Sequence, residues 1–206
     1  MPAAAFSSSR GQSVTGLYEV DCVPGLAVCL ACGAGLYAMM VAAQELRLGT
    51  AGVVAAAGAD SPSNIRRAVL VPSFTDLSAG EPISAGAHRL ALEYGFDRSA
   101  QDRWALLSHT RAKAARKSGL FDSEIVPVSG LDFDDAVLSN PEPGHFSSSE
   151  ALYPDSSTTH ANTHAIVDGG AALMMASASA LTGLAGAKPV GRYLADAVVA
   201  PDPRNM

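Results

Sequence analysis

The sequence predicts an α/β fold, and three observations lead to that prediction. Of the 206 residues, 48% are hydrophobic and 17% are charged, which is typical of a globular domain with one sizeable core. Short apolar runs at 26–30 and 53–57 are typical of buried strands. Between them, residues 33–48 have the pattern of a helix, and Gly49 follows as a glycine cap would. This strand, helix, strand order is the unit of a parallel sheet with helices on its faces.

The rest of the chain alternates predicted helices with polar segments. Residues 130–159 are rich in Ser, Pro, Asp and Gly, which predicts a long loop. The helix that follows Phe96 is expected to begin at an Asp97 cap and to end at Gly119. The sequence shows no internal repeat. Helices are expected at 91–94, 97–118 and 168–184, and a closing strand at 189–199.

Charge and hydropathy exclude several classes of protein. The formal net charge of −6 and the pI near 5.2 argue against a nucleic-acid partner, because a phosphate-binding groove needs clustered lysine and arginine. No run of about 18 apolar residues is free of Gly, Gln, Glu or Arg, so no membrane span is predicted. Residues 1–11 lack the apolar core of a secretory signal, and the number of cysteines is odd. Both observations predict a protein of the reducing cytoplasm.

Cysteines gather near the N-terminus, since Cys22, Cys29 and Cys32 lie within eleven residues. No second cluster of cysteine or histidine completes a metal site, so no metal is expected. Cys32 stands where the helix 33–48 is predicted to begin, and the partial positive charge of a helix start stabilises a thiolate. Gly33 and Gly35 follow it and leave room for backbone or substrate. The pattern indicates a nucleophile, and the alternative is a buried cysteine that acts as a small apolar residue.

Four segments carry a characteristic order of residues. Residues 32–38 read Cys-Gly-Ala-Gly-Leu-Tyr-Ala, and residues 57–63 read Ala-Gly-Ala-Asp-Ser-Pro-Ser. Residues 94–128 run from Tyr-Gly-Phe-Asp-Arg to Ile-Val-Pro-Val, and residues 162–174 contain Asp-Gly-Gly-Ala-Ala. In the same order, these segments resemble the nucleophile motif, the turn after the next strand, the loop domain and the Asn-to-Asp-Gly-Ala-Ala segment of the thiolase family.

The resemblance implies a fold, a reaction and a substrate. The fold is a partial thiolase-like αβαβα domain over 1–206, with a helical loop-domain excursion at 62–127. The reaction is acyl transfer, in which the Cys32 thiolate attacks a thioester and holds the acyl group as an acyl-enzyme. The substrate is an acyl-CoA, a coenzyme A thioester, and no bound cofactor is expected. The implied activity is that of an acetyl-CoA acetyltransferase or a 3-ketoacyl-CoA thiolase.

The resemblance also implies that Asn162, His164 and Arg66 bind coenzyme A. Asn162 and His164 lie in the segment that resembles the family's contact with coenzyme A, and His164 stands where the family has a serine that touches the pantetheine arm. Arg66 lies in the excursion, where a guanidinium could meet the phosphates of coenzyme A. His160 and His164, and less so His109, are further candidates to replace the catalytic histidine that the family carries in its C-terminal half.

Three catalytic features of the family's C-terminal half do not occur in this chain: a Gly-His-Pro histidine, an Asn-Glu-Ala-Phe asparagine and a Cys-x-Gly-Gly cysteine. One hypothesis is therefore an acyltransferase completed by more sequence or by a complementary thiolase half. The other is a non-catalytic thiolase-like subunit that binds acyl-CoA or a partner. A ketoacyl synthase of the same superfamily fits the segment 168–170 less well. An incomplete sheet exposes apolar edges, so a homo-oligomer or a partner chain is expected.

Overall fold

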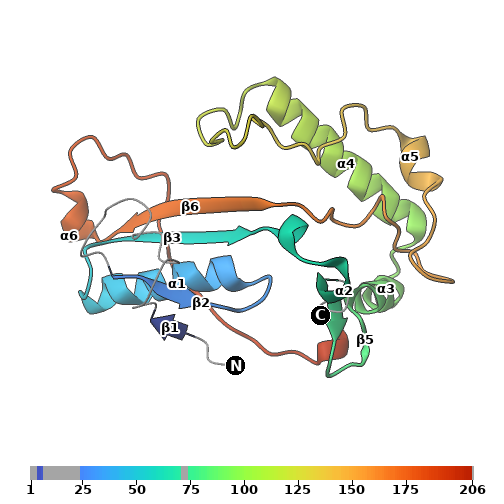
Figure 1. The fold of residues 1–206 in the computed structure, drawn as a ribbon, viewed down its shortest axis with the longest axis horizontal. Helices are drawn as coiled ribbons and strands as arrows, with labels where there is room; N and C mark the ends of the chain where they lie inside the picture. Colours follow the sequence, from blue (N-terminus) through green and yellow to red (C-terminus); the bar gives the residue numbers. More distant parts are fainter. Residues whose placement is uncertain (1–3, 7–23, 71–73, 206) are drawn as a thin grey trace. The chain divides into compact units, whose positions relative to one another are not determined.

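The computed structural model describes residues 4–6, 24–70 and 74–205 (Figure 1). The chain divides into two compact units. The first comprises Met1–Ser61 and Asp168–Val198, and the second comprises Pro62–Val167 and Val199–Met206. Helices and strands alternate along the chain, which confirms the predicted α/β class. The excursion expected at 62–127 lies wholly within the second unit.

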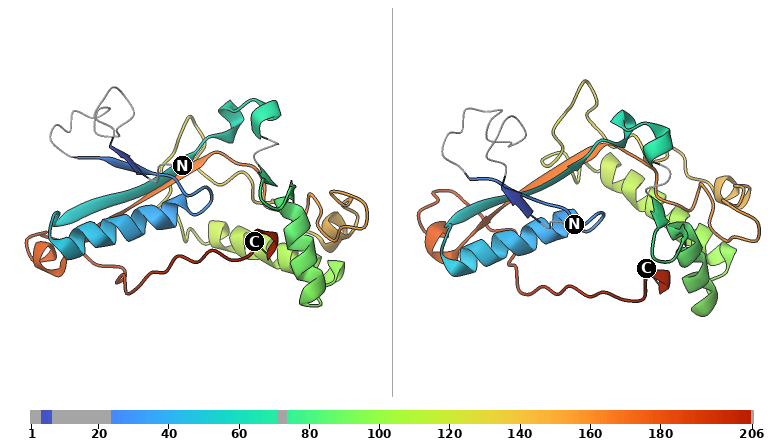
Figure 2. Two further views of the ribbon diagram at one scale, coloured as in Figure 1. Left: turned by 90° about the horizontal axis from the view of Figure 1, so that it is seen from below. Right: turned by 60° about the horizontal axis from the view of Figure 1, so that its bottom comes forward.

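The first unit contains two small antiparallel sheets. Strand β1 pairs with β2, and β3 pairs with β6 over eight residues, with Val53 opposite Ala176 and Asp60 opposite Gly169. Helix α1 packs against β3, and Figure 2 shows the two running side by side from both directions. The elements of this unit are β1 (Ala4–Phe6), β2 (Leu26–Val28), α1 (Ala34–Leu48), β3 (Val53–Asp60), β6 (Gly169–Ala176) and α6 (Ala178–Leu181).

Small residues form the contact between α1 and β3. Ala42 and Ala43 of the helix and Ala56 of the strand are buried. A methyl group added to Gly58 would lie 3.6 Å from the Cα atom of Gly35. The helix and the strand therefore lie close together at Gly58, whereas a methyl group added to Gly35 would meet nothing within 4 Å.

The predicted helix after Cys32 is confirmed, and it ends at Gly49 with the left-handed φ of 72° that glycine adopts without strain. The predicted parallel pairing is wrong, because β3 pairs with β6 and the sheets of the described residues are antiparallel. In α1 only Ala42 and Ala43 are buried, and the other residues of the helix are half-buried or exposed.

The predicted helix at 168–184 is wrong, because residues 169–176 form β6 and only Ala178–Leu181 form a helix. Alanine and methionine favour a helix in isolation, but pairing with β3 gives the backbone groups of eight residues partners along the strand. The closing strand expected at 189–199 is absent from the described structure. That segment instead meets α1 through Arg47, whose guanidinium lies 3.4 Å from Asp196 Oδ1 and 5.6 Å from the centre of the Tyr193 ring.

The second unit is mainly helical. Its longest helix, α4, confirms the predicted helix at 97–118, because the Asp97 carboxylate caps it by accepting the Ala100 N–H at 2.6 Å. Gly119 follows it with a φ of 68°, and the predicted helix at 91–94 is the end of a longer α3. The elements are η2 (Pro62–Asn64), α2 (Arg67–Leu70), β4 (Thr75–Asp76), β5 (Glu81–Pro82), α3 (Ile83–Glu93), α4 (Arg98–Lys117), α5 (Pro143–Ser147) and η4 (Pro203–Asn205).

Helix α5 interrupts the predicted loop at 130–159 and packs on α4. Its Phe146 is fully buried, with the rings of His109 and His145 centred 5.8 Å and 5.2 Å from its own. Nδ1 of His109 accepts the N–H of Leu138 at 3.3 Å, which ties the loop to the helix. Burial, and secondarily the charge of His145, lower the pKa of His109. Among the residues that the structure describes, no helix is both long and apolar enough to span a bilayer.

Candidate functional site

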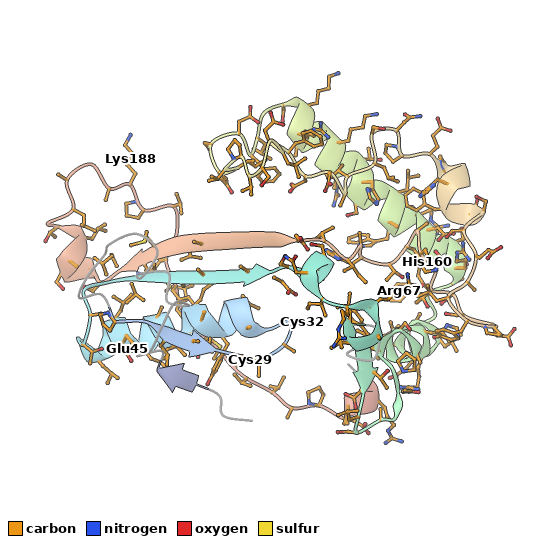
Figure 3. All side chains as sticks on the ribbon, viewed as in Figure 1. Cys29, Cys32, Glu45, Arg67, His160 and Lys188 are labelled. Atoms are coloured by element: carbon orange, nitrogen blue, oxygen red, sulfur yellow. The ribbon has the colours of Figure 1, made fainter. Side chains whose placement is uncertain are left out.

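Cys32 lies on the segment that joins β2 to α1, directly before the helix cap Gly33 (Figure 3). The structure therefore places it one residue ahead of the cap, close to the predicted position at the helix start. Its thiol is free and exposed, so the alternative of a buried apolar cysteine does not describe it. A thiol in this position is open to a substrate.

The chain turns tightly just before α1. The N–H of Gly33 donates to the Leu30 carbonyl at 2.9 Å, and the N–H of Ala34 donates to the Ala31 carbonyl at 3.1 Å. Ala31 has a φ of 44°, in the left-handed region, where a residue with a Cβ atom loses about 1–2 kcal/mol. Such strain persists where the surroundings enforce it, and it is typical of functional sites. Here it fixes the backbone that presents Cys32.

The start of α1 offers positive partial charge. The first helical hydrogen bond runs from the N–H of Tyr37 to the Gly33 carbonyl at 2.9 Å. The N–H groups of Gly35 and Leu36 therefore precede the ladder, as the first donors of a helix do. The first turn of α1 holds no acidic side chain to oppose them. This arrangement favours an anion beside Cys32, either a thiolate or the oxyanion of a reacting carbonyl.

The Asp-Gly-Gly segment lies at the same end of the first unit, because the start of α1, the end of β3 and the start of β6 lie together there (Figure 1). Oδ2 of Asp168 accepts the hydroxyl of Ser61 at 3.1 Å, and Oδ1 of Asp60 accepts the N–H of Ser61 at 2.8 Å. In this unit, Asp168 therefore fastens the ends of the two paired strands.

The three residues expected to bind coenzyme A belong to the second unit, whereas Cys32 belongs to the first. Arg66 and His164 are exposed, as is the further candidate His160. Exposed cationic and imidazole groups are free to meet a phosphate or an amide of a ligand. Their contact with coenzyme A stays a prediction.

Asn162 is held differently, because its side-chain amide is engaged within the protein. Its Nδ2 group donates to Asp102 Oδ1 and to the Ser157 carbonyl, both at 3.0 Å. Its Oδ1 atom accepts the N–H of Thr159 at 2.7 Å. Since a side-chain amide has two N–H donors, none is left for a ligand. Asn162 thus positions the segment around Thr159 on α4, and its predicted contact with coenzyme A would have to use the remaining lone pair of Oδ1.

Sequence reasoning missed the ion pair beneath Asn162. Arg98 Nε donates to both carboxylate oxygens of Asp102, at 2.9 Å and 2.8 Å, and Asp102 is only 9% exposed. Arg98 Nη2 donates to the carbonyls of Phe146 and Ser149, at 2.7 Å and 2.8 Å. The i, i+4 spacing of Arg98 and Asp102 on a predicted helix is the signal that could have found this pair.

A cavity of about 270 Å³ lies elsewhere in the second unit, between the C-terminal part of α4 and the loop that follows it. Arg116 lies over the Phe133 ring at 3.8 Å on its wall. None of the predicted site residues lines it. In the part of the chain that the structure describes, no group of three or more His, Cys, Asp or Glu side chains could hold a metal ion.

Comparison with known proteins decides the family. The family model described as "Thiolase, N-terminal domain" matches residues 62–179, more than half of the chain. The chain belongs to the thiolase family. The match begins after Cys32, so it supports the later motifs rather than the nucleophile itself.

Similar proteins extend the thiolase match toward the N-terminus. A putative acetyl-CoA C-acetyltransferase, YhfS of Bacillus subtilis, is 32% identical over 85% of this chain and 49% of its own length. A 3-ketoacyl-CoA thiolase of Klebsiella pneumoniae is 31% identical over 89% of this chain and 51% of its own length. The chain thus spans about half the length of the curated relatives it matches.

A solved structure agrees with the thiolase fold. The human mitochondrial 3-ketoacyl-CoA thiolase in complex with CoA matches 74% of this chain and 44% of its own, with a TM-score of 0.70 and 25% identity. The fold of this chain is accordingly that of a partial thiolase-like α/β domain.

Proposed function

We propose that this thiolase-family chain carries the nucleophile of a thiolase-type acyltransferase. The sulfur of Cys32 attacks the carbonyl carbon of an acyl-CoA, coenzyme A leaves as its thiolate, and the acyl group remains on Cys32 as a thioester. The acyl group then passes to coenzyme A or to the carbanion of a second acyl-CoA. The observation that carries the proposal is the exposed Cys32 thiol directly before the cap of α1.

Coenzyme A is proposed as a substrate and not as a resident cofactor. Arg66 is exposed and offers a guanidinium for phosphate, and the exposed ring of His164 offers a hydrogen bond to the pantetheine arm. Asn162 supports this surface from beneath, because its amide fixes the backbone between Ser157 and Thr159. The proposal covers both the condensation of two acyl-CoA molecules and the cleavage of a 3-ketoacyl-CoA. The cleavage would serve β-oxidation in fatty acid metabolism.

The chain is also proposed to work with a second copy or a complementary thiolase half. Among the described residues, β3 and β6 pair only with each other, so both outer edges of their sheet are open. Open edges and exposed apolar side chains favour association. Exposed apolar side chains in the first unit include Leu36, Leu48, Val53, Leu173 and Met174. A stable monomer in size-exclusion chromatography would contradict this part of the proposal.

We expect this work to take place in the cytoplasm, whose reducing pool returns exposed thiols such as those of Cys29 and Cys32 to the reduced form. This placement would be contradicted by fractionation that recovers the protein outside the cytoplasm.

Intact mass spectrometry tests the nucleophile. The reduced protein is incubated with acetyl-CoA or acetoacetyl-CoA, and Cys32→Ala and Cys29→Ala are treated in parallel. We expect one acetyl adduct on the wild type and on Cys29→Ala, and none on Cys32→Ala. Circular dichroism of each variant confirms that it is folded. Absence of an adduct on the folded wild type would favour the other hypothesis, a non-catalytic thiolase-like subunit that binds acyl-CoA or a partner.

A further inference from the structure

A second thiol lies three residues before the proposed nucleophile. Cys29 and Cys32 are both free and both exposed, and both lie on the segment between β2 and α1 (Figure 3). Only Leu30 and Ala31 separate them, which gives the Cys-x-x-Cys spacing found in dithiol redox pairs. The proposed acyl transfer uses Cys32 alone and leaves Cys29 without a role.

The backbone between the two cysteines turns, so it does not hold them apart as an extended strand would. Two successive hydrogen bonds, from Gly33 N–H to the Leu30 carbonyl and from Ala34 N–H to the Ala31 carbonyl, close turns over residues 30–33 and 31–34, which begin directly after Cys29. Ala31, between the two cysteines, has the left-handed φ of 44° that reverses the chain. Cys29 lies directly before these turns and Cys32 within both, so only Leu30 and the left-handed Ala31 separate the two thiols. A disulfide between them requires Cα atoms about 4.4–6.8 Å apart.

We infer that Cys29 and Cys32 form a reversible thiol–disulfide pair that controls the availability of Cys32. The oxidant is a low-molecular-weight disulfide such as oxidised glutathione. The Cys32 thiolate attacks one sulfur of that disulfide, a mixed disulfide forms, and one glutathione thiolate leaves. The Cys29 thiolate then attacks the Cys32 sulfur and displaces the second glutathione. Two protein thiols are oxidised, and one glutathione disulfide is reduced to two thiols.

The consequence for activity rests on the proposed function. A sulfur within a disulfide has no thiolate to attack a thioester, so the oxidised pair cannot accept an acyl group. A thiol reductant reverses the exchange and restores the nucleophile. The pair also protects Cys32, because a disulfide is reversible whereas oxidation of a lone thiolate to the sulfonic acid is not.

The test uses Cys22→Ser, because the chain has three cysteines and this variant leaves only Cys29 and Cys32. The variant is needed since no lysine or arginine stands between Arg10 and Arg47, so one tryptic peptide holds all three. The reduced protein is treated with oxidised glutathione, alkylated with iodoacetamide and weighed intact. The matched control carries both Cys22→Ser and Cys29→Ser.

We expect Cys22→Ser to lose about 2 Da as a monomer, with no glutathione adduct and no alkylation, as one internal disulfide requires. In the control that carries both Cys22→Ser and Cys29→Ser, the reaction should stop at one glutathione bound to Cys32, because no second thiol can displace it. The inference is overturned if Cys22→Ser also stops at the adduct, keeps two alkylatable thiols or forms a disulfide-linked dimer. Acetylation of Cys22→Ser by acetyl-CoA is then measured on the reduced protein, on the oxidised protein and on the oxidised protein after treatment with dithiothreitol. This series separates the redox pair from the proposed acyltransferase function. An internal disulfide in a protein that never accepts acetyl would refute the acyltransferase and leave the redox pair intact.

Discussion

Replacing Arg98 with alanine should destabilise the second unit more than the same replacement of Arg103 on the same helix. The guanidinium joins three parts of that unit, since it pairs with Asp102 on its own helix and donates to the carbonyls of Phe146 and Ser149. The substitution removes all of these donors at once. Among the described residues, it leaves the carboxylate of Asp102, which is 9% exposed, with only the Asn162 amide as a hydrogen-bond partner.

The magnitude follows from burial. Breaking one side of a buried ion pair costs about 3–5 kcal/mol, whereas an exposed pair is worth about 0–1 kcal/mol. The side chains of Arg98 and Asp102 are 31% and 11% exposed, so the pair lies toward the buried end of that range. We therefore expect Arg98→Ala to lower the free energy of unfolding by about 3 kcal/mol. Arg98→Lys keeps the charge but lacks the planar fork, and should cost about half as much.

The assay is urea unfolding followed by tryptophan fluorescence. The chain has one tryptophan, Trp104, on α4, but it is 69% exposed, so circular dichroism at the helical band is recorded alongside its fluorescence. Arg103→Ala is the matched control, because Arg103 lies on the same helix and its guanidinium donates to the Ser99 hydroxyl on that helix, at 2.7 Å, and not to another element of the described structure. We expect the control to change stability by less than about 0.5 kcal/mol. Equal midpoints and slopes for Arg98→Ala and Arg103→Ala would refute the reasoning.

Two further changes test the pH response and a helix cap. Burial holds the pKa of His109 in the folded protein below its ordinary value. Between these two pKa values the unfolded chain therefore binds more protons than the folded one. The stability of the second unit should consequently fall as the pH drops from neutrality through the folded pKa. His109→Gln should flatten this fall in urea midpoints measured across pH, and an unchanged slope would contradict the assignment. Gly49→Ala should cost about 1 kcal/mol, because the residue keeps a φ of 72° and nothing lies within 4 Å of the added methyl group. Thermal unfolding measures this loss, and a higher midpoint would show that the left-handed cap is not needed.

Local signals predicted helices α1 and α4 and the position of the proposed nucleophile. The Asp97 cap of α4 and the left-handed Gly49 and Gly119 act on their nearest neighbours, so their effects can be read from adjacent residues. Cys32 was likewise predicted at a helix start and lies one residue before the cap of α1. The spacing of Cys29 and Cys32 was equally visible, but it suggests a redox pair only once both thiols are known to be exposed.

The partners of Asn162 could not be predicted from the sequence. Asp102 is on α4 and Ser157 is on a later loop, and the packing of the second unit brings both to one amide. Sequence resemblance placed Asn162 beside coenzyme A. The fold shows its amide donors engaged inside the protein, which is a matter of distances between segments far apart in the chain.

The sequence by itself determined the family, the α/β class, the caps of the helices and the cysteine at the start of α1, because each depends on the identity and spacing of nearby residues. Only the tertiary structure decided that residues 169–176 form a strand and that the sheet is antiparallel. The apolar residues of this segment suit either a helix or a strand. Hydrogen bonding to β3, which lies far away in the chain, selects the strand, because it gives the backbone of both segments its partners.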